Sequence, residues 1–311
     1  MSLAPRVVLV HRTTEYEELV ARHGTHGQAA FFLASRGRDI KEVAERHRRT
    51  RQALTEVTSA IPLTWRQTRV ERADLDRFLF APEDVVVVVG QDGLVANVAK
   101  YLDGQPVLGI DTDPGRNPGV LVRHRPGDAA KLFVSTQSGR GDFDELTMVE
   151  AVADDTQRLV ALNEIYLGAA GHRTARYRLG LEDDGGVVEA QASSGVLIGT
   201  GTGATGWIRS VWQERWGCPR SSEAESGGRQ LRLPSPTEER LLWFVREAWP
   251  SPATGTSRVA GELTAATRLH LTVESERLVA FGDGMETDAV ELTWGQTLRV
   301  GVCRERLRLV C

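Results

Sequence analysis

The feature that most constrains the fold is the run Asp84–Gly90, in which five consecutive valines stand between an aspartate and a glycine. Apolar runs without alternation are typical of strands covered on both faces, as in parallel sheets. Short apolar runs at Arg6–His11 and Gln105–Ile110 predict further strands, and helical spacing over Ile40–Val57 predicts a surface helix. With a helix over Leu94–Leu102, the sequence predicts a βαβ unit inside an N-terminal α/β domain.

From about residue 128 the pattern changes to short alternating apolar runs separated by Gly, Asp and Ser. This change predicts a β-rich C-terminal domain. The expected strands are Leu159–Leu162, Ala175–Leu179, Gly195–Ile198, Leu269–Val273, Leu278–Phe281 and Leu298–Val302. We therefore predict domains at 1–127 and 128–311, with the last residues free to pack back on the first domain. The stretch Gly217–Pro236 reads as an exposed loop.

Composition excludes several classes of protein. The 311 residues are 41% hydrophobic and 26% charged with a formal net charge of -4, and no stretch concentrates Lys or Arg, which argues against nucleic-acid binding. No run approaches the roughly 18 apolar residues of a spanning helix, and the start lacks a signal-peptide pattern, which favours a cytoplasmic protein without membrane association. The three cysteines are far apart and predict neither a disulfide framework nor a metal site.

The first motif, Gly90-Gln91-Asp92-Gly93, follows the valine strand directly. Two glycines allow a close approach of the backbone to an anion, and the following helix start offers unpaired N–H groups to phosphate. The carboxylate of Asp92 could orient a hydroxyl, accept its proton or hold Mg²⁺ against phosphate oxygens. A plain tight turn is the structural alternative.

Two further motifs lie in the second half of the chain. The pair Asn163–Glu164, taken alone, is typical of a solvated strand end. Residues 201–206 satisfy GxGxxG, but β-rich surroundings and the lack of a strand-terminal acid about 20 residues on argue against a Rossmann motif. A Gly/Thr loop that leads into a helix still suits a nucleotide, with Trp207 either stacked on a base or packed in the core. Asp283–Asp288 predicts a hairpin turn.

Taken in order, these motifs resemble the NAD kinase family, most closely its mitochondrial type. The GGDGT loop of the family matches Gly90–Leu94, its Asn-Glu motif matches Asn163–Glu164, and its TGTGS loop matches Thr200–Ala204. Three shorter segments also look like family segments: Gly109–Pro114 resembles GVNTDP, Ser193–Gly195 resembles SSG, and Phe281–Gly284 resembles the late DG hairpin. Gln91 and Leu94 depart from the glycine and threonine of GGDGT.

The resemblance implies a Rossmann-like N-terminal domain, a β-rich C-terminal domain and a nucleotide in the cleft between them. It implies transfer of the γ-phosphate of ATP, with Mg²⁺, to the 2′-hydroxyl of the adenosine ribose of NAD, giving NADP. It also implies a homodimer or a larger homo-oligomer, and no metal site made by the protein alone.

The resemblance assigns roles residue by residue. Asp92 would be catalytic, and Gly90, Gln91, Gly93 and Asn97 would form the phosphate-donor loop. The nucleotide would contact Asn163, Glu164, Ser194, Thr200, Thr202, Gly203, Thr205, Trp207 and Ser210. Three alternatives stay open: the same chemistry on another nucleotide or nucleoside, a nucleotide-binding regulator with weakened catalysis, and an oxidoreductase that uses Gly201–Gly206.

Overall fold

The computed structural model describes residues 5–116, 119–137, 141–154, 156–182, 185–216 and 232–311. Its chain forms two compact units, one made of residues up to 144 together with 308–311, and one made of residues 145–307. Residues 128–144, assigned to the second domain on sequence, lie in the first unit. Ala129, Leu132 and Phe133 join the apolar core of that unit, which explains the difference. Most of the stretch predicted as a loop at 217–236 lies outside the described residues.

The first unit is built on a parallel sheet. Its strands are β1 (Arg6–His11), β2 (Arg66–Glu71), β3 (Asp84–Gly90) and β4 (Pro106–Asp111), in the order β2-β1-β3-β4. The valines of β3 are at most 5% exposed, so the predicted doubly covered parallel strand is confirmed. The end of β16 (Thr297–Val310) adds a strand beside β4, where Arg308 and Leu309 pair with Pro106 and Val107.

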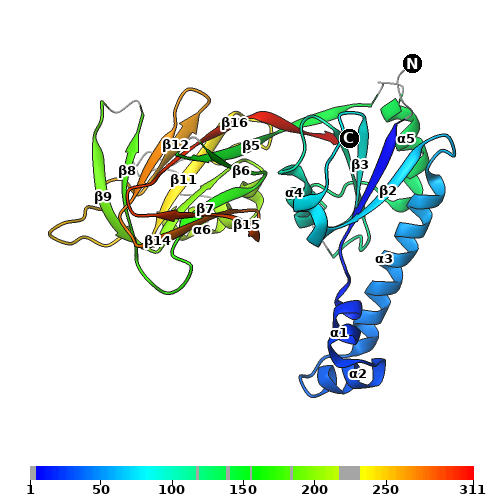
Figure 1. Ribbon diagram of the computed structural model, residues 1–311. Helices are drawn as coiled ribbons and strands as arrows, with labels where there is room; N and C mark the ends of the chain where they lie inside the picture. The colour runs from blue at the N-terminus through cyan, green and yellow to red at the C-terminus, as the bar shows by residue number, and fades with distance from the viewer. Residues whose placement is uncertain (1–4, 117–118, 138–140, 155, 183–184, 217–231) are drawn as a thin grey trace, which may run out of the picture. The chain divides into compact units, whose positions relative to one another are not determined.

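Helices cover both faces of this sheet. Helices α3 (Ile40–Ala60) and α5 (Ala129–Gln137) pack against the face that carries Leu9, Val87 and Ile110. Helix α4 (Asp92–Ala99) follows β3 on the other side (Figure 1). Helices α1 (Glu15–His23) and α2 (His26–Ala34) pack on the first turns of α3 around a small separate core, and short 3₁₀ helices lie at Arg72–Arg77 (η1) and Pro126–Asp128 (η2).

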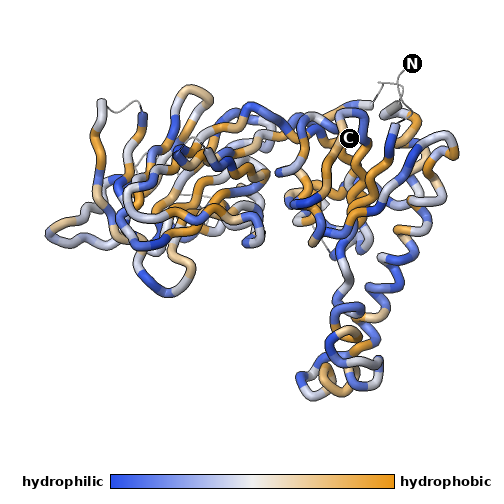
Figure 2. Tube along the Cα trace, in the orientation of Figure 1, coloured by the Kyte–Doolittle hydropathy of each residue, from blue (hydrophilic) through white to orange (hydrophobic). Residues whose placement is uncertain are grey.

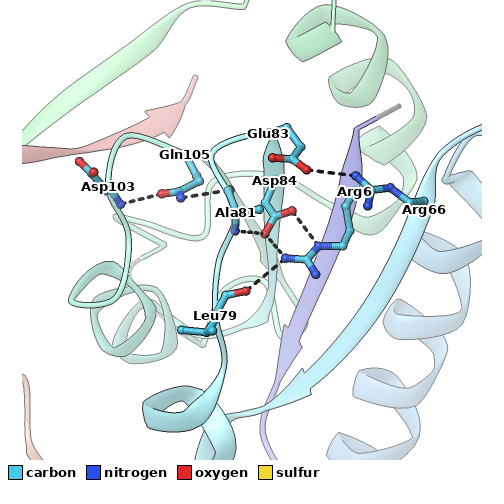
Figure 3. A network of polar contacts seen from close by, with 8 residues as sticks. All are labelled: Arg6, Arg66, Leu79, Ala81, Glu83, Asp84, Asp103 and Gln105. Atoms are coloured by element: carbon cyan, nitrogen blue, oxygen red, sulfur yellow. Dashed lines mark hydrogen bonds and ion pairs between the residues drawn. The ribbon is translucent and has the colours of Figure 1, made fainter. Parts of the chain in front are cut away.

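A buried ion pair fixes the amino ends of β1 and β3. Asp84, which is fully buried, accepts hydrogen bonds from Arg6 Nε at 2.8 Å, from the other guanidinium nitrogen at 2.5 Å and from the Ala81 N–H at 2.7 Å (Figure 3). The guanidinium also donates to the Leu79 carbonyl at 3.2 Å. The pair raises the pKa of Arg6 through its hydrogen bond and charge interaction with Asp84. Because parallel strands share one direction, this network lies at the edge opposite the Gly90 motif.

The second unit is a sandwich of two sheets. The six-stranded antiparallel sheet has the order β12-β11-β10-β7-β14-β15, and the facing sheet has β16-β13-β8-β9 with β5 paired to β16 and β6. The bounds are β5 (Phe143–Ala153), β6 (Gln157–Ala161), β7 (Glu164–Gly168), β8 (Ala175–Leu181), β9 (Val188–Ser193), β10 (Gly195–Gly199), β11 (Arg240–Arg246), β12 (Ala260–Thr264), β13 (Leu269–Val273), β14 (Arg277–Gly282) and β15 (Met285–Thr293). The predicted β-rich half of the chain and its expected strands are confirmed.

The core of the second unit lies between these two sheets. Tyr177 and Leu271 come from one sheet, and Ile165, Trp243 and Leu278 come from the other. Figure 2 shows the hydrophobic residues concentrated along the strands of each unit and hydrophilic residues along α3. None of the helices in the described part of the chain combines the length and the apolar character that crossing a bilayer requires.

Helix α6 (Trp207–Trp216) packs on the outer face of the six-stranded sheet, preceded by the 3₁₀ turn η3 (Gly203–Thr205). Its buried side chains Ile208, Val211 and Trp212 contact Leu242 and Phe244. The predicted helix after the Gly/Thr loop is therefore confirmed. This packing fixes the loop at Gly199–Gly206 between β10 and α6, on the surface of one sheet.

Candidate functional site

The Gly90 motif forms the junction of β3 and α4. Gln91 precedes the helix with extended backbone angles of -129° and 164°, and Asp92 is the first helical residue, two positions earlier than the sequence predicts. A Cβ added at Gly93 would meet nothing within 4 Å, so the backbone of the first helical turn is open there. The side chain of Leu94 is buried and covers Gly90, whose added Cβ would lie 3.1 Å from Leu94 Cδ2. Leu94 thus serves the core, and Gln91 is exposed.

The carboxylate of Asp92 is held by a neighbouring loop. Oδ1 accepts the N–H groups of Leu121 at 2.8 Å and Val122 at 2.9 Å, and Oδ2 accepts the N–H of Val120 at 3.0 Å. An ionised carboxylate offers about four acceptor positions. Among the described contacts, one position on Oδ2 therefore stays available to a further donor. The side chain is half-buried, so it is anchored without being removed from solvent.

The sequence analysis missed this loop, although Gly109 signals it. A Cβ at Gly109 would lie 2.1 Å from the Leu121 carbonyl oxygen, so only glycine lets the loop cross β4 there. The loop continues to His124, whose N–H donates to the Gly109 carbonyl at 3.1 Å and whose carbonyl accepts the Asp111 N–H at 2.8 Å. The glycine of the Gly109–Pro114 segment thus allows the contact that anchors Asp92.

Two buried acids lie beside this motif, Asp111 at the end of β4 and Asp113 two residues after it. Asp111, opposite Gly90 in the β3–β4 register, uses Oδ1 to accept the Asp113 N–H at 2.8 Å. The carboxylate of Asp113 pairs with Arg49 of α3 at 2.5 Å. Both acids are 8% exposed. The carboxyl ends of neighbouring parallel strands meet at one sheet edge, which is where ligands bind in open α/β sheets.

Asn97, predicted in the phosphate-donor loop, lies inside α4. It is 5% exposed, and its side-chain oxygen accepts a hydrogen bond from Arg72 Nε at 2.6 Å. This bond ties η1 to α4. The structure therefore places Asn97 away from the open first turn, in a contact that positions the helix.

The pair Asn163–Glu164 forms the bend between β6 and β7. Glu164 is the first residue of β7 and is half-buried, so its side chain is neither a fully solvated strand end nor a core residue. Burial, together with the negative charge of Asp283, raises the pKa of Glu164 to about 8. Asp283 stands in the turn between β14 and β15, as the hairpin prediction placed it. At neutral pH the carboxyl of Glu164 is therefore mostly protonated.

The loop that starts at Thr200 lies against this bend. Thr200 is fully buried, donates from Oγ1 to the Leu162 carbonyl at 2.5 Å and accepts the Thr202 N–H at 3.1 Å. A Cβ at Gly203 would lie 2.4 Å from the Asn163 carbonyl oxygen and 3.1 Å from Glu164 Oε2, so glycine is required for the contact. Among the described residues Thr202 Oγ1 is buried and has no hydrogen-bond partner. Such an atom is a candidate ligand contact.

The GxGxxG match at 201–206 is not a Rossmann motif. The preceding strand β10 pairs antiparallel with both β7 and β11, whereas the Rossmann motif requires a parallel βαβ unit. A Cβ at Gly201 would lie 2.0 Å from the Ser235 carbonyl oxygen, so this glycine serves chain packing. The oxidoreductase alternative loses its structural basis.

Aromatic side chains flank the start of α6. The ring of Trp207 stacks on Tyr166 with centroids 5.3 Å apart, and the guanidinium of Arg246 lies 5.6 Å from the Trp207 ring. The hydroxyl of Tyr166 donates to the Ser194 carbonyl at 2.7 Å, and burial raises the pKa of Tyr166. Trp207 is half-buried, so it is packed on one side and accessible on another. The sequence analysis missed Tyr166 because it lies inside an ordinary strand pattern. The available signal was its position two residues after Glu164, which places both side chains on the same face of β7.

The predicted residues thus fall into separate groups. In the first unit Gly90, Gln91, Asp92 and Gly93 share one junction. In the second unit Asn163, Glu164, Thr200, Thr202 and Gly203 are joined by direct contacts. Ser194 and Trp207 are linked through Tyr166, while Thr205 and Ser210 are exposed at η3 and α6.

Among the described residues Glu150, Cys303 and Glu305 have metal-ligating atoms within 4.8 Å of one another. Arg158 occupies this cluster, donating to Cys303 Sγ at 3.3 Å and to Glu305 Oε2 at 2.5 Å. Burial and the neighbouring Glu305 raise the pKa of the Cys303 thiol to about 12. The cluster is an ion-pair network around a protonated thiol, and it is unsuited to a cation.

Comparison with curated proteins finds NAD kinases. The chain is 25% identical over 261 residues to rat mitochondrial NAD kinase 2, covering 66% of this chain and 60% of the relative, and 25% identical over 256 residues to the human protein, covering 66% and 58%. NAD kinase 1 of Trichormus variabilis is 29% identical over 144 residues, covering 42% of this chain and 46% of the relative. The chain spans about 60% of the length of the rat relative. No protein-family model matches.

Among solved structures the chain is similar to yeast NADH kinase complexed with NADH. The TM-score is 0.57 at 15% identity, covering 99% of this chain and 84% of the other. The α/β unit and the β-rich unit of this chain thus have the fold of that kinase. Sequence relatives, motif order and fold agree, which confirms the resemblance to the NAD kinase family.

Proposed function

We propose that this chain is an NAD(H) kinase that transfers the γ-phosphate of ATP to the 2′-hydroxyl of the adenosine ribose, giving NADP(H). The proposal is supported by the names of the relatives and by the order of the three motifs. The observation that carries it is the anchored carboxylate of Asp92, which has one acceptor position left and stands beside the open backbone of Gly93.

Asp92 and the start of α4 would act on the phosphate and the hydroxyl. Phosphoryl transfer passes through a loose transition state, so catalysis rests on positioning and charge stabilisation. The unpaired N–H groups at the start of α4 would bind donor phosphate oxygens. Oδ2 of Asp92 would accept the hydroxyl proton as the new oxygen–phosphorus bond forms and the bond to ADP breaks. The three N–H groups that hold the carboxylate fix its direction during this step.

Mg²⁺ would accompany ATP. Asp111 places a carboxylate at the end of β4, opposite Gly90, and Mg²⁺ is commonly bound by one or two carboxylates together with substrate phosphates. Oδ1 of Asp111 accepts the Asp113 N–H, and Oδ2 would be the oxygen that binds Mg²⁺. The ion would neutralise charge on the phosphates.

Residues of the second unit would bind the acceptor nucleotide. A protonated Glu164 can both donate and accept a hydrogen bond, and the buried hydroxyl of Thr202 can do the same. Together with Asn163 they suit the hydroxyls and ring nitrogens of adenosine. The accessible side of Trp207, stacked on Tyr166, suits a base. Ser194, Thr205 and Ser210 are exposed around this cluster.

The test is product analysis. The purified protein is incubated with ATP, Mg²⁺ and either NAD or NADH, and mass spectrometry should find a gain of one phosphate that an NADP-dependent dehydrogenase recognises. Asp92→Asn should abolish this product, while Asp103→Asn, at an exposed acid of the same unit, should not. Saturable NAD binding without product from any nucleotide acceptor would refute kinase activity and favour the regulator. Replacing ATP by polyphosphate tests the donor.

Assembly and compartment are further proposals. The resemblance implies a homodimer or a larger homo-oligomer, which light scattering after gel filtration would measure. The cytoplasmic location stays a prediction, because the curated relatives include proteins named mitochondrial.

A further inference from the structure

Asp283 forms a tight hairpin turn. It stands in the turn between β14 and β15 with φ of 53°, followed by Gly284 with φ of 65°. Two successive residues with positive φ make the two-residue hairpin turn that favours Asn-Gly and Asp-Gly pairs. Its N–H donates to the Glu164 carbonyl at 3.1 Å. The turn is therefore tied to the start of β7 through its backbone.

The carboxylate of Asp283 makes the larger contact. Oδ2 accepts the Leu162 N–H at 2.8 Å, and Oδ1 accepts the N–H groups of Asn163 at 2.7 Å and Glu164 at 3.4 Å. Three successive backbone donors of the bend between β6 and β7 thus point at one side chain. A charged acceptor strengthens such hydrogen bonds. The bend is therefore shaped by an aspartate about 120 residues further along the chain.

The same bend supports the Gly/Thr loop from its other side. The Thr200 N–H donates to the Asn163 carbonyl at 2.9 Å, and Thr200 Oγ1 donates to the Leu162 carbonyl at 2.5 Å. Asp283 therefore holds the N–H groups of a segment whose carbonyls hold Thr200. A shift of the bend would move Asn163, Glu164 and the loop together.

We propose that Asp283 is the positioning residue of the nucleotide site in the second unit, acting through the bend that carries Asn163 and Glu164. The inference rests on the proposed function, since it concerns the site assigned there to the acceptor. Asp283 itself contacts backbone groups, and its effect on a nucleotide is transmitted by Asn163, Glu164 and the loop at Thr200.

The charge of Asp283 has an effect on the pKa of Glu164 that can be measured separately from the stability of the fold. Burial and Asp283 together raise the pKa of Glu164 to about 8. Thr200, Thr202 and Thr205, on the loop packed against Glu164, are uncharged, and the other acids of the hairpin are Glu286, Asp288 and Glu291, of which Glu291 pairs with Arg277. Removal of the charge at 283 should therefore lower the pKa of Glu164 while its burial is retained.

The experiment compares Asp283→Asn with Glu286→Gln, an exposed acid of the same hairpin, in the full chain. Carboxyl ¹³C NMR titration of Glu164 and amide exchange at 162–164 are measured without nucleotide. Asp283→Asn should lower the pKa of Glu164 and speed exchange at the three amides, and Glu286→Gln should change neither. The dissociation constant of NADH, measured by its fluorescence, should rise about tenfold, the factor that ~1.4 kcal/mol produces.

Failure of this proposal can be separated from failure of the proposed function. An unchanged pKa of Glu164 and unchanged exchange in Asp283→Asn would overturn the positioning role, whatever the activity. The expected changes in the free protein without any effect on NADH binding would overturn the assignment of the site. If Asp283→Asn does not fold, exchange in the unaltered protein decides: amides 162–164 should be protected as strongly as those of residues 165–168 in β7, and rapid exchange would overturn the inference.

Discussion

The raised pKa of Glu164 predicts a specific loss of stability as the pH rises. The ordinary value for the side chain is 4.5, and in the folded chain it is about 8 because of burial and the charge of Asp283. Between these values the folded state binds the proton more tightly than the unfolded state does. The free energy of unfolding that this group contributes is therefore fully present below pH 4.5 and is lost as the pH rises through about 8.

The magnitude follows from the interval between the two values. Each pKa unit corresponds to about 1.4 kcal/mol, so the interval sets an upper limit of about 5 kcal/mol. Between pH 5 and pH 8 the share lost by this one group is roughly 3 kcal/mol. The glutamine side chain of the variant Glu164→Gln cannot ionise, so the variant should lack this share of the pH dependence. The free energy of unfolding of the variant minus that of the unaltered protein should therefore be larger at pH 8 than at pH 5.

Urea unfolding at pH 5, 6, 7 and 8 measures the effect. Six of the seven tryptophans lie in the second unit, so tryptophan fluorescence reports mainly on the unit that contains Glu164. Histidines also titrate in this range, but the difference between Glu164→Gln and the unaltered protein cancels them. Glu286→Gln, which changes an exposed acid, should behave like the unaltered protein. Parallel stability curves for Glu164→Gln and the unaltered protein would refute the assigned burial of Glu164.

Three substitutions test the backbone contacts of the site. Asp92→Asn should abolish turnover and also lower the free energy of unfolding by about 2 kcal/mol, because an amide cannot accept all three N–H groups; near-normal turnover would remove Asp92 from the mechanism. Gly93→Ala should leave folding intact, or add up to about 1 kcal/mol of helix stability, because no atom lies near the new methyl group. Its KM for ATP should nevertheless rise, and unchanged ATP kinetics would exclude a close phosphate there. Gly203→Ala should cost about 2 kcal/mol in thermal melts, because its Cβ would lie 2.4 Å from the Asn163 carbonyl oxygen; an unchanged melting temperature would contradict the described loop.

Much of the fold could be predicted because local patterns determine it. The valine run of β3 has no alternation because α3 and α4 cover opposite faces of its sheet, and the structure confirms the parallel pairing. The runs after residue 128 alternate because each sandwich strand has one face toward the core and one face outward, which is again a local pattern. The division between the units was harder to locate, because α5 has a helical pattern that fits either unit. Only its packing with the core of the first unit assigns it.

The site was predictable as a set of motifs but less so as a set of contacts. Nothing in the spacing of residues brings Asp283 to Glu164 or Val120 to Asp92, since these contacts join segments far apart in the chain. The raised pKa of Glu164 depends in part on such a contact, which the Asn-Glu pattern alone does not reveal. Leu94, a departure from the family motif, proves to be a core residue whose effect on phosphate binding must come through Gly90.

Two of the four Asp-Gly pairs of the chain show why surroundings decide the role. Asp92 and Asp283 each accept the N–H groups of three successive residues, so both stabilise a segment distant in sequence. Asp92 stands at a helix start with open backbone beside it, where the proposed reaction places a phosphate and a hydroxyl. Asp283 stands in a tight turn against the half-buried Glu164, and its charge adds to the effect of burial in raising the pKa of that neighbour. The same dipeptide can thus face a substrate in one unit and act through another side chain in the other. The kinetic consequence is that Asp92 variants should lose turnover, whereas Asp283 variants should lose nucleotide affinity first.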